Sequence, residues 1–229
     1  MPLYPLFLDL AGRRCLVVGA GPVGQRKAAG LLDAGARVRI VAPGGVGQVS
    51  NLSRRGAATN PPSAGQVTNL SHAASLECID GEYRPAHLDG VALAFAAATP
   101  EVNARVVADA KARGIWVNNA SDPEGADFAV PAHRRNRFVQ IAVTTGGMSP
   151  AVAARFADAM AEALDDGWIN LVIAHHILRQ QVRERVPKAR RRALWAALSE
   201  PVWRDRLRTE TVTSVLEAMQ PLVDAAAGP

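Results

Sequence analysis

The sequence predicts an α/β fold: a Rossmann-like, doubly wound parallel sheet, followed by a small strand-containing segment and a C-terminal helical domain. Three observations support this prediction. Short apolar runs alternate with helical segments over the first half of the chain, which is typical of a parallel sheet covered by helices. A GxGxxG turn follows the first apolar run, and from residue 150 onward the pattern is helical throughout.

The first element is an apolar strand over residues 15–18, which runs into the glycine-rich turn and then a helix over 23–34. Gly19 permits the tight turn, Gly21 lets the backbone approach a pyrophosphate, and Gly24 lets helix and strand pack closely. The helix N-terminus offers unpaired N–H groups and a partial positive charge to phosphates. A second strand follows, as the motif requires. We therefore predict dinucleotide binding, with a purely structural glycine-rich turn as the alternative.

The other elements of the sheet follow in order. Further strands are predicted over residues 37–42, 77–80, 91–97 and 115–119, with a helical turn near 85–88. Thr99 and Pro100 mark the start of a helix that ends at Gly114, because threonine caps a helix and proline suits its first position. This alternation predicts the doubly wound sheet.

Residues 44–76 interrupt the alternation and are rich in Gly, Ser, Asn and Pro. The heptad GQVSNLS at 47–53 recurs as GQVTNLS at 65–71. Two polar copies cannot build a solenoid, which needs at least about three stacking repeats. We predict an inserted surface loop without a catalytic role.

The second half of the chain has a different character. Two strands are predicted over 127–131 and 137–144, joined by a basic turn, and Ser149 with Pro150 can begin the next helix. Helices are predicted over residues 151–164, 168–186, 189–198 and 211–225. The predicted domains are residues 1–118 for the dinucleotide, 119–150 for a middle segment, and 151–229 for the helical part.

Composition fits a folded globular protein, with 48% hydrophobic and 21% charged residues. No apolar run approaches the roughly 18 residues of a membrane span, so we expect no membrane partner. Residues 1–10 lack the features of a signal peptide. The two cysteines make neither a disulfide framework nor a zinc site, which favours a reducing, cytoplasmic location.

Positive charge is concentrated in one stretch of the chain, although the net charge is only +5. Seven basic residues fall within this stretch: Arg179, Arg183, Arg185, Lys188, Arg190, Arg191 and Arg192. Such a cluster suits nucleic acid, a membrane surface, a polycarboxylate ligand or simply a solvated helix face. Because aromatic residues are only 5% and do not interleave with a basic motif, we expect no nucleic-acid partner.

The end of the second strand departs from the usual dinucleotide fingerprint. An acid at this position normally bonds the ribose hydroxyls. Here the strand runs into Pro43 and Gly44, with neither a carboxylate nor an arginine for a 2′-phosphate. The lack of a basic residue favours NAD over NADP. The missing acid also keeps open a non-catalytic NAD-binding regulatory module.

Several segments together carry a family resemblance: LFLDLAG at 6–12, GAGPVGQRK at 19–27, LDAGARV at 32–38, VAP at 41–43 and TTGGMSP at 144–150. With these motifs the chain resembles the siroheme synthase N-terminal module, a precorrin-2 dehydrogenase that is often also a sirohydrochlorin ferrochelatase. The resemblance covers nearly the whole chain apart from 44–76.

The resemblance implies NAD-dependent removal of two hydrogens from precorrin-2, which gives sirohydrochlorin. In bifunctional members Fe²⁺ insertion follows, with Co²⁺ as an alternative metal, and the protein is a homodimer formed through the segment after the nucleotide domain. The cofactor contacts expected in this chain are Gly19, Gly21, Pro22, Val23, Gly24, Pro43 and Gly44.

The same resemblance implies a catalytic carboxylate after the strand at 115–119. We assign it to Asp122, with Glu124 and Asp127 as rivals because the local match is imperfect. A carboxylate could accept a proton during oxidation and take pyrrole protons when a metal enters. The alternative is a turn aspartate before Pro123.

Substrate contacts are expected at Asn119, Thr145 and Gly146, where the Thr145 hydroxyl can line the tetrapyrrole pocket; a glycine-rich turn that opens a helix is the alternative. The basic candidates are Arg134, Arg135 and Arg137, together with the helix around Arg179 to Arg192. Precorrin-2 carries eight carboxylates, so an arginine-lined cleft would attract and orient it. The histidines show no metal-ligand spacing, so no protein metal site is predicted. Iron would be held by the tetrapyrrole nitrogens and the carboxylate.

Overall fold

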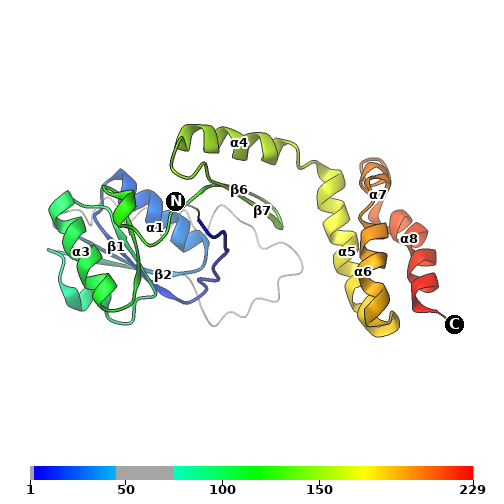
Figure 1. Ribbon diagram of the computed structural model, residues 1–229, viewed down its shortest axis with the longest axis horizontal. Coiled ribbons are helices and arrows are strands. Elements are labelled where there is room, and N and C mark those ends of the chain that lie inside the picture. Colours follow the sequence, from blue (N-terminus) through cyan, green and yellow to red (C-terminus); the bar gives the residue numbers. More distant parts are fainter. Residues whose placement is uncertain (1–2, 45–74, 229) are drawn as a thin grey trace. The chain divides into compact units, whose positions relative to one another are not determined.

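The computed structural model describes residues 3–44 and 75–228. The chain forms two compact units, an N-terminal unit of Leu3–Val130 and a C-terminal unit that contains Pro131–Pro229 (Figure 1). The boundary lies inside the predicted middle segment 119–150. The repeated heptads of the predicted insertion lie outside the described residues.

The N-terminal unit is a five-stranded parallel sheet in the order β3-β2-β1-β4-β5. The strands are β1 (Arg14–Val18), β2 (Arg37–Ala42), β3 (Ser75–Asp80), β4 (Leu93–Ala96) and β5 (Trp116–Asn119). The helices are α1 (Pro22–Asp33) and α3 (Pro100–Ala112), with 3₁₀ turns η2 (Pro85–Leu88) and η3 (Pro123–Gly125). This topology confirms the predicted doubly wound α/β fold. The strand order reverses between β1 and β4, where such folds bind their ligands.

Strand β1 is buried on both faces, so its alternate residues pack into two separate hydrophobic cores, one on each side of the sheet. Cys15 and Val17 pack with the α1 residue Leu31 on one face. Leu16 and Val18 pack with the α3 residue Val106 on the other. Helices therefore cover both faces of the sheet, as expected for a parallel sheet with continuous apolar strands (Figure 1).

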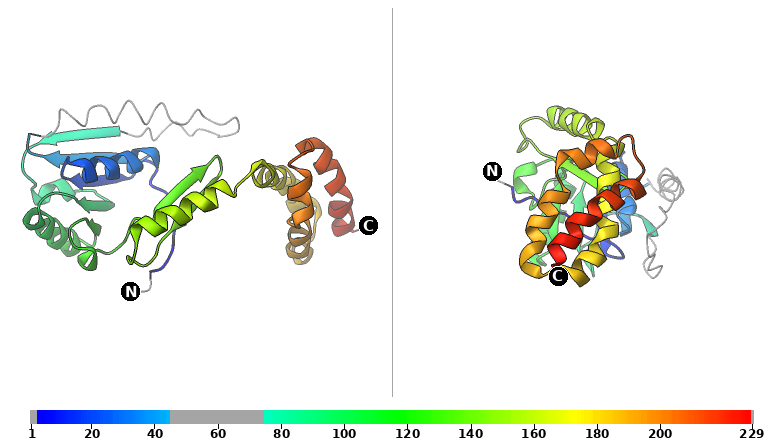
Figure 2. Two further views of the ribbon diagram at one scale, coloured as in Figure 1. Left: turned by 90° about the horizontal axis from the view of Figure 1, so that it is seen from above. Right: turned by 90° about the vertical axis from the view of Figure 1, so that its right-hand side faces the viewer.

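The C-terminal unit begins with an antiparallel hairpin and continues as helices. The hairpin strands are β6 (Ala132–Asn136) and β7 (Val139–Val143). The helices are α4 (Pro150–Glu162), α5 (Asp166–Arg185), α6 (Lys188–Leu198), α7 (Pro201–Arg206) and α8 (Val212–Ala227). Helix α4 packs along the hairpin (Figure 2), and α5, α6 and α8 share a core that includes Val182, Leu198 and Met219. The short α7 was not predicted.

Of the two strands predicted over 127–131 and 137–144, the first is wrong, because residues 127–131 form no strand, and the second corresponds to β7. The segment expected as a basic turn is itself strand β6, and the turn is Arg137-Phe138, with φ +50° at Arg137. Residues along β6 alternate between half-buried and exposed, and half-buried Arg134 is neutralised by Asp158 of α4, with Nε–Oδ1 2.6 Å. A charged side chain can thus occupy the packed face of this hairpin.

No helix among the described residues is long and apolar enough to cross a membrane.

Candidate cofactor and active site

The glycine-rich turn connects β1 to α1 at the switch point of the sheet. Gly19 has φ +108°, and a Cβ there would lie 2.2 Å from the Ala97 carbonyl oxygen. A Cβ on Gly24 would lie 2.0 Å from the Gly19 carbonyl oxygen. These two positions therefore require glycine for the turn and for helix–strand packing, as the sequence predicted.

Gly21 differs from both because no atom of residues 3–44 or 75–228 lies within 4 Å of the Cβ position built on it. It is the N-cap of α1, without a side-chain cap and with no acid in the first turn. The first hydrogen bond of the helix is donated by the Gln25 N–H to Gly21 O at 2.9 Å. The N–H groups of Val23 and Gly24 come before it and have no acceptor within the helix. Open space beside free N–H groups fits the pyrophosphate of a dinucleotide.

An acid does lie near the end of β2, but it comes from the neighbouring strand. Asp80 is the last residue of β3 and pairs in register with Ala42 of β2. Its Oδ1 accepts a hydrogen bond from the Gly44 N–H at 2.7 Å. Sequence reasoning missed this residue, although its place at the end of the predicted strand 77–80 was visible.

Beyond β4 and β5, a polar network joins two loops at the same edge of the sheet. The buried Asn103 donates from Nδ2 to Ser121 Oγ at 2.9 Å and accepts from the Ala98 N–H at Oδ1. The Ser121 hydroxyl donates to Asn119 Oδ1 at 3.0 Å. Asn119 is 7% exposed, so the structure places it as a residue that positions the loop after β5. Its substrate contact remains a prediction.

The three candidate carboxylates have different surroundings. Asp122 is exposed and caps η3, where its Oδ1 accepts from the Glu124 N–H at 3.1 Å. Asp127 is tied to the edge of β5, since its Oδ2 accepts from the Val117 N–H at 2.9 Å. Glu124 is exposed on η3. Asp122 and Asp127 are both exposed, and each accepts one backbone hydrogen bond through one carboxylate oxygen, so all three acids stay candidates.

The remaining predicted substrate residues belong to the C-terminal unit. The Thr145 hydroxyl donates to Ser149 O and accepts from Ser149 N–H, both at 3.0 Å, and so closes the turn before α4. Gly146 has φ +64°, which this turn needs. Arg134 is paired with Asp158, and Arg135 donates to Arg137 O at 3.4 Å. Their contacts with a substrate are untested expectations.

A doubly wound parallel sheet with a glycine cradle at its switch point defines a dinucleotide-binding protein. The family model described as "Putative NAD(P)-binding" matches residues 6–132, and the chain belongs to this family. This match confirms a nicotinamide dinucleotide as the cofactor.

Similarity to individual proteins confirms the resemblance to the siroheme synthase module. The chain is 36% identical over 202 residues to the siroheme synthase of Chromobacterium violaceum, which covers 87% of this chain and 39% of that protein. It is 32% identical over 209 residues to the siroheme synthase of Azotobacter vinelandii, with 90% and 41% covered. The chain thus spans about two fifths of the length of these curated relatives.

A solved structure has the same architecture. "SirC, precorrin-2 dehydrogenase" matches with a TM-score of 0.65 and 21% identity, covering 96% of this chain and 100% of that chain. At this level of identity the likeness establishes the fold.

Proposed function

We propose that this protein is an NAD-dependent dehydrogenase that oxidises precorrin-2 to sirohydrochlorin. The observation that carries the proposal is the cradle at Gly21, which leaves open space next to the free N–H groups of α1. Two comparisons support it: membership of the NAD(P)-binding family and similarity to siroheme synthases over most of the chain.

The chain's own residues have distinct roles in this proposal. The turn from Gly19 to Gly24 binds the pyrophosphate, and the Asp80 carboxylate accepts a hydrogen bond from a ribose hydroxyl. This favours NAD over NADP, because the negative charge of Asp80 would repel a 2′-phosphate. NAD⁺, when bound, would act as the hydride acceptor. The oxidation also releases a proton, which Asp122 accepts at its free carboxylate oxygen.

Substrate binding and assembly involve the C-terminal unit. Arg135, Thr145 and Gly146 would line the tetrapyrrole site, and Arg134 supports the hairpin through Asp158. A homodimer is supported by an apolar stripe on α4, in which Val152, Phe156 and Met160 recur every fourth residue and are 46%, 55% and 53% exposed. Such a stripe on a helix that already buries Ala153 and Ala157 fits a second copy of the chain.

Ferrochelatase activity is a second proposal, supported by the siroheme synthase relatives and by the exposed Asp122. Fe²⁺ is then a substrate held by the tetrapyrrole nitrogens, while Asp122 accepts the pyrrole protons. Siroheme formation from sirohydrochlorin and Fe²⁺ tests this proposal. An unchanged insertion rate in the Asp122→Asn variant would remove this residue from that step.

The dehydrogenase is tested by supplying purified protein with precorrin-2 and NAD⁺ under anaerobic conditions. The proposal expects NADH and sirohydrochlorin to appear in equal amounts. Tight NAD binding without turnover of authentic precorrin-2 would instead favour a regulatory, non-catalytic module.

A further inference from the structure

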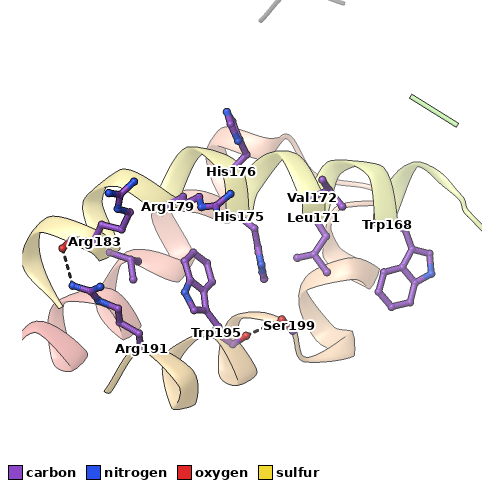
Figure 3. Close-up of a pocket in the computed structure, with 11 residues that line it drawn as sticks. Trp168, Leu171, Val172, His175, His176, Arg179, Arg183, Arg191, Trp195 and Ser199 are labelled. Carbon is purple, nitrogen blue, oxygen red and sulfur yellow. Dashed lines mark hydrogen bonds between the residues drawn. The ribbon is translucent and has the colours of Figure 1, made fainter. Parts of the chain in front are cut away.

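The C-terminal unit carries a groove between α5 and α6 with a volume of about 710 Å³, which lies in the range of sites for small ligands (Figure 3). On α5 the groove residues recur along one face of the helix from Trp168 to Arg183. At a rise of 1.5 Å per residue this face is about 22 Å long. The groove shares no residue with the cofactor turn or with the loop of Asp122.

Two tryptophans form the aromatic part of the wall. Trp168 lies at one end of the groove and is 37% exposed, while Trp195 lies near its middle (Figure 3). The His175 ring packs on Trp195, with centroids 5.0 Å apart, and its Nε2 lies 2.9 Å from Leu198 O. These contacts hold Trp195 in place, and the exposed part of its half-buried ring offers an apolar surface to a ligand. The Arg204 guanidinium lies over the Trp168 ring, 5.1 Å from its centroid, and adds positive charge at that end of the groove.

The groove is positively charged, because Arg179, Arg183 and Arg191 line it and none of the described residues that line it is acidic. Arg191 has a structural role, since it donates to Val186 O at 2.9 Å and to Arg183 O at 2.8 Å and so caps the end of α5. Arg179 and Arg183 are exposed and form no ion pair with any described residue. They lie one helical turn apart, about 6 Å along α5.

We infer that this groove binds a planar ligand that carries several carboxylates, with the ring against the tryptophans and two carboxylates on Arg179 and Arg183. Guanidinium groups bind carboxylates through paired, charge-assisted hydrogen bonds, and an aromatic wall selects a flat ring over a flexible anion. Given the proposed function, on which this identification rests, the ligand is a carboxylated tetrapyrrole held outside the cofactor unit. The groove is then a second tetrapyrrole site for incoming substrate or departing product.

Titration of the full chain with uroporphyrin, a stable porphyrin with eight carboxylates, tests the inference in the absence of NAD. The variant is Arg179→Glu/Arg183→Glu. Its matched control is Arg155→Glu/Arg192→Glu, which makes the same change in charge at exposed residues outside the groove. We expect the groove variant to raise the Kd about tenfold or more and the control to leave it near the wild-type value.

The position of the bound porphyrin is read from the tryptophans. With 5-fluorotryptophan in the protein, ¹⁹F NMR gives one signal for each of the four tryptophans. We expect the largest shifts at Trp168 and Trp195. Largest shifts at Trp116 or Trp203, or equal affinity of the groove and control variants, would overturn the inference. Citrate that binds as tightly as uroporphyrin would also overturn it, because a flat ring would then play no part.

The outcome is separable from that of the proposed function. If precorrin-2 is oxidised normally and the groove variant keeps the wild-type affinity for uroporphyrin, only the proposed groove site is refuted. If no oxidation is seen but uroporphyrin binding depends on Arg179 and Arg183, the proposed dehydrogenase activity is refuted and the groove site stands. If thermal unfolding shows that the glutamate variant is misfolded, Arg179→Gln/Arg183→Gln provides the same readout.

Discussion

Gly24 lies so close to Gly19 that a Cβ on Gly24 would sit 2.0 Å from the Gly19 carbonyl oxygen. Helix α1 can therefore approach β1 only through a glycine at this position. The middle glycine of the motif has open space instead, so substitutions at the two positions should have different consequences.

Gly24→Ala should destabilise the protein by about 1–3 kcal/mol or prevent folding, because the new methyl group forces α1 away from the sheet. Gly21→Ala should change stability by less than about 1 kcal/mol, since its φ of −67° suits alanine, yet weaken NAD binding about tenfold or more by filling the space next to the α1 N–H groups. Thermal unfolding and calorimetric titration measure the two effects. Equal losses of stability would contradict this division of roles.

Asp80→Asn should relax the preference for NAD. The amide oxygen can still accept from the Gly44 N–H, but the charge that would repel a 2′-phosphate is gone. We expect the ratio of NADP to NAD affinity to rise about tenfold. Glu82→Gln, two residues along the chain and exposed, is the control. An unchanged ratio of NADP to NAD affinity in Asp80→Asn would show that another group distinguishes the ribose from its 2′-phosphate.

Asp122→Asn should lower kcat for precorrin-2 oxidation about a hundredfold or more, through loss of a proton acceptor. The melting temperature should hardly change, because asparagine also caps a helical turn. Parallel assays of Glu124→Gln and Asp127→Asn identify the acid: a comparable fall in kcat in either of these, with Asp122→Asn active, would move the role to that residue.

Phe156→Glu should dissociate the proposed homodimer, since it places a charge in the exposed stripe of α4. We expect the dimer Kd to rise about a hundredfold, as for a central interface residue. Sedimentation velocity gives the oligomeric state, and Arg155→Glu tests whether any added charge on α4 suffices. A chain that is monomeric before the substitution would refute the dimer itself.

Cys15 predicts a dependence of stability on alkaline pH. Burial raises the pKa of this thiol from 9.0 to about 11. Below pH 9 the thiol is protonated in both the folded and unfolded states. As pH rises from 9 towards 11 the unfolded chain releases the proton first, which favours unfolding. Wild type should therefore lose stability relative to Cys15→Ala over this window in urea titrations, and a constant difference would show that the thiol is not buried.

Local signals made much of the fold predictable. The glycine spacing predicts the β1–α1 turn, and the structure confirms the two predicted helix caps, which depend on a few adjacent residues. Thr99 accepts a hydrogen bond from the Val102 N–H, and Ser149 accepts one from the Val152 N–H. Features that depend on distant partners were harder to predict. From the sequence, Arg134 and Arg135 predict an exposed turn, whereas the structure places both on strand β6 because Asp158 of α4 neutralises Arg134.

The candidate site follows the same rule, in that its local motif is predictable and its long-range contacts are not. The cradle follows from one motif, but Asp80 reaches the end of β2 only through the register of a strand that follows a long insertion. The Asn103–Ser121–Asn119 network likewise joins helix α3, the loop after β5 and the end of β5, and no spacing in the sequence predicts it. The choice among Asp122, Glu124 and Asp127 stays a prediction, because Asp122 and Asp127 each accept one backbone hydrogen bond.

Calorimetric titration of the wild-type chain with NAD⁺ and NADP⁺ tests the cofactor cradle most directly. We predict saturable heat with one NAD⁺ bound per chain, weaker binding of NADP⁺, and NAD⁺ binding about tenfold or more weaker in Gly21→Ala. Absence of heat with both coenzymes, from folded protein at high concentration, would contradict the assignment of the Gly19–Gly24 turn as a pyrophosphate site.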